Sequence, residues 1–278
     1  MPLFKSGKMP NVLIVTRTKN RPLLLARAIK SVQQQTFTDY LHVIVNDGGE
    51  EAEVEQLLSS FARDNINVIH NKHSLGMEAA SNVGLRFCVA DYAVIHDDDD
   101  SWEPSFLLCM VAYLQANPEQ AGVVCNIRQV FERVTEGDVE SISSRLFNPA
   151  VTQFKLADFF VCNQFVPIGF LYRYELHNKV GFFNESLKVC GDLEFHIRVL
   201  QDNLIAKLDL CLANYHIRVN THNLALINSV NDVDSHQQLS SKVIAEYDQR
   251  TRLQCITSLL RVKLVYRFIN IVRRFYER

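Results

Sequence analysis

The sequence predicts an α/β fold built on a mostly parallel sheet with helices on both faces. From residue 11 onward, short apolar runs alternate with longer amphipathic segments, which is the pattern of strands joined by crossover helices. Polar residues also gather directly after the apolar runs, where open parallel sheets bind their ligands. The 278 residues exceed one ordinary domain and fall short of two large ones, so we expect one core domain with an appendage.

The first half of the chain gives the clearest elements. Helix starts are marked by Pro22 and Pro104, because the missing N–H of proline costs nothing in the first turn of a helix. Apolar residues then recur at helical spacing in the first of these helices. Strands are predicted at Val12–Val15, His42–Val45, Asn67–Ile69 and Tyr92–Ile95. Helices are predicted over Pro22–Gln35, Glu50–Asp64, Met77–Val89 and Pro104–Ala116.

The second half gives weaker patterns. We expect a strand over Gly122–Val134, a polar loop over Gly137–Pro149 and a helix over Leu193–Gln201 that opens directly after Asp192. The segment Leu253–Tyr276 is predicted to form one or two helices with an apolar side and an arginine-rich side.

Composition excludes several classes of protein. No run of 18 apolar residues could cross a bilayer, and no apolar stretch of signal-peptide length follows the basic N-terminus. We therefore expect a cytoplasmic protein without a membrane span. The seven cysteines are scattered and never in Cys-x-x-Cys spacing, which argues against a disulfide framework and a zinc site and favours small buried side chains.

The C-terminal part of the chain is basic. Residues 241–278 hold nine Lys or Arg residues and three acidic ones, a net charge of +6 against −8 for the rest. An amphipathic basic helix over 253–278 could dock on the cytoplasmic face of the inner membrane, because such helices bind anionic lipid surfaces. Packing of its apolar side on the core or on a second subunit is the equal alternative.

Charged residues gather after the first, second and fourth predicted strands. They are Thr16–Arg21, Asn46–Gly49 and His96–Asp100. The run Asp97–Asp100 is the most informative, because adjacent carboxylates repel and are costly to bury without a cation. Mg²⁺ or Mn²⁺ prefers such oxygens and bridges them to phosphates. A solvated acidic turn is the alternative, whereas the spacing of a calcium loop is absent.

Taken together, these motifs resemble those of family 2 glycosyltransferases with the GT-A fold, over about Val12 to His222. The resemblance implies a Rossmann-like, mostly parallel sheet followed by C-terminal helices. The matching segments are Val15–Pro22, Ala28–Thr36, Val43–Gly49, Gly76 with Asn82–Gly84, Asp97–Pro104, Gly181–Glu185 and Cys190–Arg198. Several motifs in the family's order are far more specific than any one of them.

The resemblance assigns a role to each matching polar residue. Asp47 is expected to accept the N3–H of a uracil or thymine ring. Asp97 and Asp99 are expected to meet a Mn²⁺ or Mg²⁺ ion and the diphosphate, and either His216 or His222 could join them. The remaining residues expected around the nucleotide-sugar are Thr16, Thr18, Asn20, Arg21, Gly76, Asn82 and Asp98. Ordinary turn chemistry for Asp47 and helix capping for Asn20 are the alternatives.

Asp192 is the expected catalytic base. Transfer with inversion requires a base opposite the leaving diphosphate, because the acceptor hydroxyl loses its proton as the new bond forms. The family's motif places that base at Asp192. The alternative is an N-cap of the helix that follows, which is compatible with catalysis because a helix N-terminus can position a carboxylate.

The chain departs from the family's pattern at five positions. Arg17 stands where the family usually has Pro, Lys19 where it has Tyr, Asn46 where it has Asp, Ser81 where it often has Arg, and Gly191 where it has Glu. Arg17 and Lys19 could supply phosphate contacts instead.

The expected organisation is an N-terminal tail (1–10), a catalytic domain (11–222) and a basic helical extension (223–278). The domain divides into a nucleotide-binding half (11–120) and an acceptor-binding half (121–222). We expect a sugar transferase that uses a UDP- or dTDP-sugar and a saccharide or lipid-linked saccharide acceptor in bacterial cell-surface polysaccharide or glycolipid synthesis. A homo-oligomer is possible, and no nucleic acid is expected as a partner. The alternatives are a non-catalytic nucleotide-sugar-binding or scaffold protein and a sugar-nucleotide pyrophosphorylase. A pyrophosphorylase would require a glycine-rich phosphate-binding loop after the first strand, and Thr16–Arg21 contains no glycine.

Overall fold

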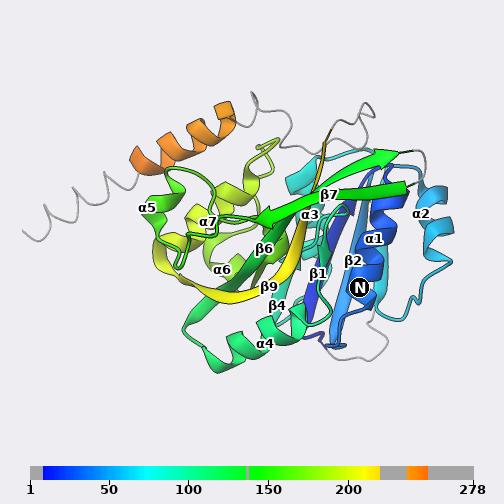
Figure 1. Ribbon diagram of the computed structural model, residues 1–278, viewed down its shortest axis with the longest axis horizontal. Helices are drawn as coiled ribbons and strands as arrows, with labels where there is room; N and C mark the ends of the chain where they lie inside the picture. The colour runs from blue at the N-terminus through cyan, green and yellow to red at the C-terminus, as the bar shows by residue number, and fades with distance from the viewer. Residues whose placement is uncertain (1–8, 136–137, 220–236, 250–278) are drawn as a thin grey trace, which may run out of the picture.

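The computed structural model describes residues 9–135, 138–219 and 237–249 (Figure 1). Its centre is a mixed sheet whose strands run in the order β3-β2-β1-β4-β8-β6-β9-β5, with β7 paired to β6. The first four strands in this order are parallel. They are β1 (Val12–Thr18), β2 (Tyr40–Asp47), β3 (Ile66–Asn71) and β4 (Tyr92–Ile95). The structure thus confirms the four strands predicted from apolar runs.

Helices cover both faces of this parallel part, as predicted. Successive side chains of a strand point to opposite faces. On β2, Ile44 packs with buried residues of α1 (Pro22–Gln33) and α2 (Glu51–Leu58), whereas Val45 belongs to the other core. Helix α3 (Met77–Leu85) lies on that second face, where Gly84 leaves room for Val15 and Val45 because a Cβ there would stand 2.4 Å from Val15 Cγ1.

The second half of the chain extends the same sheet. Strand β6 (Gln120–Thr135) confirms the strand predicted over Gly122–Val134, and it runs parallel to β9 (Leu204–Arg218), which the sequence did not predict. Two short strands, β8 (Phe170–Arg173) and β5 (Ser101–Trp102), are antiparallel to their neighbours. Helix α4 (Phe106–Ala116) packs against β6 and β9.

The polar loop predicted over Gly137–Pro149 is wrong, because β7 (Asp138–Leu146) pairs antiparallel with β6. Two apolar side chains of this strand, Ile142 and Leu146, are exposed, and Val139 is half-buried. Backbone hydrogen bonds to β6 hold the strand without a buried face, so its side chains carry no apolar alternation that sequence reading could detect.

Four further helical segments lie between β7 and β9 in the sequence. They are α5 (Leu156–Phe159), the 3-10 turn η1 (Pro167–Gly169), α6 (Leu176–Val180) and α7 (Gly191–Asp202). The helix predicted after Asp192 is therefore confirmed as α7. Residues 237–249 form another helix (Figure 1). The Tyr247 hydroxyl of this helix donates a hydrogen bond to the Glu194 carboxylate of α7.

Several sequence predictions fall outside the described residues or stay open. The predicted helices over 253–276 lie outside the described residues, and within the described ranges no helix is long and apolar enough to cross a membrane. Both predicted halves of the catalytic domain share one sheet, so their division stays a prediction. None of the described cysteines is in a disulfide, but Cys162 is exposed, contrary to the expectation of burial. It sits at the rim of the cavity described next.

Candidate active site

A cavity of about 970 Å³ opens where β1, β2 and β4 end, and it reaches across to the start of α7. Polar side chains line its sheet side, and apolar side chains line much of the rest. Most of the predicted site residues meet here. They are Thr18, Asn20, Arg21, Asp47, Gly76, Asp97, Asp98, Asp99 and Asp192.

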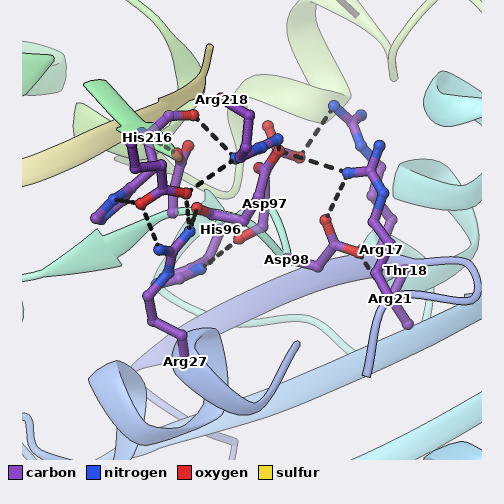
Figure 2. A network of polar contacts seen from close by, with 12 residues as sticks. Arg17, Thr18, Arg21, Arg27, His96, Asp97, Asp98, His216 and Arg218 are labelled. Atoms are coloured by element: carbon purple, nitrogen blue, oxygen red, sulfur yellow. Dashed lines mark hydrogen bonds and ion pairs between the residues drawn. The ribbon is translucent and has the colours of Figure 1, made fainter. Parts of the chain in front are cut away.

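The four consecutive aspartates each have different partners (Figure 2). Asp98 accepts a hydrogen bond of 2.7 Å from the Thr18 hydroxyl and lies 3.2 Å from Arg21 Nη1. Asp99 pairs with Arg218 and lies 3.4 Å from the same Arg21 nitrogen. The last of the four, Asp100, accepts the backbone N–H of His216. The cluster is therefore held by arginines and hydrogen bonds from β1, from the N-cap of α1 and from β9.

These surroundings give the four carboxylates different proton affinities. Burial and the neighbouring Asp99 raise the pKa of Asp98 to about 7. The pKa of Asp100 is well above its usual value for the same two reasons. Burial acts in the same direction on Asp99, but Arg218 and Arg21 outweigh it and lower its pKa. Asp99 is thus the member of the cluster that the protein holds most firmly as an anion.

Asp97 is the carboxylate best suited to take an additional ligand. Its Oδ1 lies 3.0 Å from Arg17 Nη2, yet no hydrogen-bond donor among the described residues is aligned with this buried oxygen. Hard divalent cations bind such oxygens, often through only one or two protein carboxylates together with phosphates of the ligand. The described residues include no group of three or more His, Cys, Asp and Glu side chains arranged around one point. The Asp97 oxygen therefore fits a hard divalent metal whose remaining ligands would come from elsewhere, such as phosphate oxygens of a bound ligand.

Behind the aspartates lies a second layer of buried charge. The side chain of Arg218, at the end of β9, is 0% exposed and connects Asp99, the His216 carbonyl and Glu132. Glu132 also accepts bonds from Arg27 at 2.8 Å and from His216 Nδ1 at 2.9 Å (Figure 2). Arg27 in turn reaches the Asp99 carbonyl. This layer holds the backbone of the aspartate run in place and compensates the negative charge of Asp99.

Asp47 organises the loop on the other side of the cavity. Its two carboxylate oxygens accept bonds from the Asn71 amide, the Ser74 hydroxyl and the backbone N–H groups of Leu75 and Gly76. Burial alone would raise the pKa of Asp47, but these hydrogen bonds lower it below its usual value. A carboxylate has about four lone-pair sites, so a further donor would have to replace one of these four.

Asp192 faces the cluster from the first turn of α7. Asn163 Nδ2 donates to Asp192 Oδ2 at 2.7 Å, and Asn163 Oδ1 lies 3.2 Å from His196 Nδ1. Because the Asn163 amide group donates to the carboxylate, its oxygen must accept, and His196 is then protonated on Nδ1. Burial lowers the pKa of His196 to about 3, so this ring is neutral. The chain from His196 through Asn163 fixes the direction in which Asp192 points.

Two residues predicted to contact the nucleotide do not line the cavity, and these assignments are corrected. Thr16 is fully buried inside β1, where its hydroxyl lies 2.8 Å from His42 Nε2 on the neighbouring strand. Asn82 is also buried, and its amide exchanges hydrogen bonds with the backbone of Phe183. The two side chains therefore hold strands and loops together. His222 lies outside the described residues.

The proposed capping role of Asn20 is also wrong. Residue 21 is the N-cap of α1, and no side chain caps that helix. Asn20 has a positive φ of 53° and accepts the backbone N–H of Glu50 through its side chain. It therefore shapes the turn between β1 and α1 at the edge of the cavity.

Sequence reasoning missed several residues of the site. Glu78 lies in a segment that was predicted only as a helix, and Asn163 lies in a segment for which no element was predicted, although both residues line the cavity. Arg218 lies two residues after His216, which was considered as a ligand, and it pairs with Asp99. The helix at 237–249 contributes Gln237, Ser240 and Ile244 to the wall of the cavity.

Comparisons with known proteins agree with this geometry. The chain is 29% identical over 199 residues to YwdF, an uncharacterized glycosyltransferase of Bacillus subtilis strain 168, covering 71% of the chain and 70% of YwdF. It is 28% identical over 108 residues to an Escherichia coli enzyme, the UDP-Gal:alpha-D-GlcNAc-diphosphoundecaprenol beta-1,3-galactosyltransferase. That match covers 38% of the chain and 39% of the enzyme.

A solved structure shares the fold. The chain resembles S. aureus TarS 1-349 in complex with UDP-GlcNAc with a TM-score of 0.64 and 18% identity, over 86% of the chain and 70% of TarS 1-349. The sheet and helices are thus those of a GT-A glycosyltransferase. The model of the family described as "Glycosyl transferase family 2" matches residues 13–181. This chain therefore belongs to glycosyl transferase family 2.

Proposed function

We propose that the chain is an inverting glycosyltransferase that moves a sugar from a nucleoside-diphosphate donor to an acceptor hydroxyl, with Asp192 as the base. One observation carries the proposal. Asp192 lines the same cavity as the aspartate run, and its charge acts on both Arg17 and Asp97. A base on one side and a cluster of charged side chains on the other leave room between them for a sugar.

The proposed reaction is a single displacement. The acceptor oxygen forms a bond to C1 of the donor sugar and gives its proton to a carboxylate oxygen of Asp192. The bond from C1 to the diphosphate oxygen breaks in the same step, and the nucleoside diphosphate leaves with the bonding electrons. Attack from the side opposite the leaving group inverts the configuration at C1.

Cationic side chains of the chain would hold the diphosphate. Arg17, Lys19 and Arg21 all line the cavity beside the aspartates, and guanidinium groups match phosphate oxygens in geometry and charge. We further propose Mn²⁺ or Mg²⁺ as the cofactor, held by Asp97 and Asp99. When bound, such an ion would neutralise negative charge on the leaving diphosphate.

A uridine or thymidine donor is favoured. Asp47 lies at the edge of the cavity as a firm anion, which suits an acceptor for the N3–H of these bases. The Ser74 hydroxyl, which now donates to Asp47, would yield its place to the base.

We propose a saccharide or lipid-linked saccharide acceptor and a role in bacterial cell-surface polysaccharide or glycolipid synthesis. The named substrate of the Escherichia coli relative, a diphosphoundecaprenol-linked sugar, supports this class. The apolar part of the cavity includes Val161, which is 79% exposed, and Ile244. The enzyme would then be cytoplasmic and act at the inner membrane.

Turnover measurements test the enzymatic proposal. UDP-, dTDP- and GDP-sugars are incubated with the full chain and Mn²⁺, and release of nucleoside diphosphate is followed with and without candidate acceptors. The proposal expects turnover with a UDP- or dTDP-sugar and a product of inverted anomeric configuration by NMR. Stoichiometric binding without any turnover would favour a non-catalytic nucleotide-sugar-binding protein instead.

Membrane docking is tested separately. The intact chain and a form ending at Gln249 are mixed with vesicles that contain anionic lipid and are floated through a gradient. Docking through 253–278 predicts that only the intact chain floats. Identical behaviour of the two forms rules it out.

A further inference from the structure

Glu78 of α3 and Gly191 of α7 interlock at the wall of the cavity. A Cβ atom on Gly191 would stand 2.2 Å from Glu78 Cδ and 2.4 Å from its Oε1. The carboxyl group of Glu78 therefore fills the space in which any other side chain at position 191 would begin. It also accepts a hydrogen bond from the backbone N–H of Gly191.

Burial of Glu78 is unusual for a carboxyl group. The residue is 4% exposed, and glutamate is rarely buried unless a partner compensates its charge. Arg17 is that partner, because its Nη1 lies 3.8 Å from a Glu78 oxygen, while its other terminal nitrogen pairs with Asp97. Burial raises the pKa of Glu78 to about 7, against the opposing effect of Arg17.

Helix α7 needs a hydrogen-bond acceptor from outside at its first residue. Its N-cap, Cys190, has a left-handed backbone with φ of 65°, and the Cys190 side chain makes no capping hydrogen bond. Backbone N–H groups in the first turn require acceptors, and a negative charge is favoured there. Glu78 supplies this acceptor from a different helix, one residue before Asp192.

Glu78 thus touches both sides of the cavity. It bonds to the start of the helix that carries Asp192, and it lies beside the arginine that holds Asp97. Met77 and Ser81 of the same helix α3 also accept bonds from Arg17 Nη1. Helix α3 therefore connects the start of α7, which carries Asp192, with Arg17, which pairs with Asp97. The distance between these two groups matters if Asp192 is the base.

We propose that Glu78 is a positioning residue for the transfer reaction, and that it holds the start of α7 and Arg17 so that Asp192 keeps a fixed position against the donor. The inference rests on the proposed function of Asp192. It also accounts for glycine at position 191, because the carboxylate that the local sequence lacks comes from Glu78.

Substitutions at the two positions test the interlock. Glu78→Ala is expected to lower kcat about 100-fold, as a misplacement of about 1 Å does, with the KM for the donor changed much less. Glu78→Gln keeps an acceptor oxygen and the shape of the side chain, so it is expected to retain more activity than Glu78→Ala. Gly191→Glu alone should lose activity because its side chain collides with Glu78.

The decisive variant is the double substitution Glu78→Ala with Gly191→Glu, which returns a carboxylate to the same place from α7. It is expected to be more active than either single variant. Glu53→Ala removes an exposed glutamate of α2 and serves as the control, with unchanged kinetics. Urea unfolding of each variant shows whether it is folded, and Glu78→Gln carries the test if Glu78→Ala does not fold.

Two outcomes separate this inference from the proposed function. Wild-type kcat in Glu78→Ala, together with an inactive Asp192→Asn, would overturn the positioning role and leave the base in place. Wild-type activity in Asp192→Asn would instead overturn the base, and the inference with it. If Glu78 acts through Asp192, adding Glu78→Ala to Asp192→Asn lowers the residual rate no further, whereas a further 100-fold loss contradicts the inference.

Discussion

Replacement of Arg218 by methionine tests the buried charge layer beneath the aspartate run. The side chain is 0% exposed and compensates Asp99 and Glu132, of which Glu132 is 2% exposed. Methionine fills a similar volume without a charge, so the variant leaves both carboxylates with less compensation inside the protein. Removal of one partner from a buried ion pair costs about 3–5 kcal/mol. Arg21 and Arg27 remain beside the two carboxylates, so we expect the lower end of that range.

An exposed ion pair provides the matched control. Arg63 Nη1 lies 2.7 Å from Glu55 Oε2, and the two side chains are 45% and 46% exposed. Exposed pairs contribute about 0–1 kcal/mol, so Arg63→Met is expected to change stability by less than that. The contrast between the two arginines isolates the effect of burial.

Urea unfolding followed by circular dichroism measures both variants. Addition of Glu132→Gln to Arg218→Met should recover part of the lost stability, because it removes one of the uncompensated charges. A free energy of unfolding for Arg218→Met no lower than that of Arg63→Met would refute the view that Arg218 compensates the cluster.

Three further predictions concern protonation, the base and the metal. Burial lowers the pKa of His42 from 6.5 to about 3. Between these two pH values the unfolded imidazole binds a proton while the folded one stays neutral. Stability is therefore lost as the pH falls below 6.5. Between pH 6.5 and 5 the loss is about 2 kcal/mol, and His42→Gln should flatten the pH dependence measured by urea unfolding; an unchanged slope would contradict it. Asn163→Ala is expected to lower kcat about 10-fold with little change in the KM for the donor, because Asp192 loses the amide that orients it. A larger change in KM than in kcat, measured by steady-state kinetics, would contradict this role. Chelation with EDTA should abolish turnover and Mn²⁺ should restore it, with Asp97→Asn requiring more Mn²⁺ than wild type; full activity in EDTA would remove the metal from the mechanism.

The parallel half of the sheet could be predicted from sequence because three of its four strands, β1, β2 and β4, are buried on both faces. Apolar runs such as Val12–Val15 and His42–Val45 identify these strands directly. The polar residues that follow them share one edge of the sheet, so the sequence alone predicts that Asp47 and the aspartates lie close together. Local patterns thus locate the part of the site that lies at strand ends.

The remaining parts of the site depend on contacts between distant segments. Asp99 and Arg218 are 119 residues apart in sequence, and they meet because β5, which begins two residues after Asp99, pairs with β9. Thr16 and Thr18 differ by two residues on the same strand, yet only Thr18 reaches the cavity. Which of the two side chains reaches the cavity depends on the packing of neighbouring elements, so it cannot be predicted from the local motif alone.

Glu78 illustrates the same limit. Its sequence neighbours indicate only a helix, and its role follows from the space that Gly191 leaves 113 residues later in the chain. The absence of a side chain at 191 was visible in the sequence as a departure from the family. The sequence does not show that the Glu78 carboxyl group occupies the space beside Gly191.

The most direct test of the account compares Asp192→Asn with Asp202→Asn in a transfer assay with a UDP- or dTDP-sugar donor. Both residues belong to α7, but Asp192 lines the cavity, whereas Asp202 is exposed at the other end of the helix. A general base contributes about 10²- to 10⁴-fold to the rate. The account predicts a loss of that size in kcat for Asp192→Asn, with the donor still bound and Asp202→Asn unchanged. Equal kcat values for Asp192→Asn and wild type would contradict it.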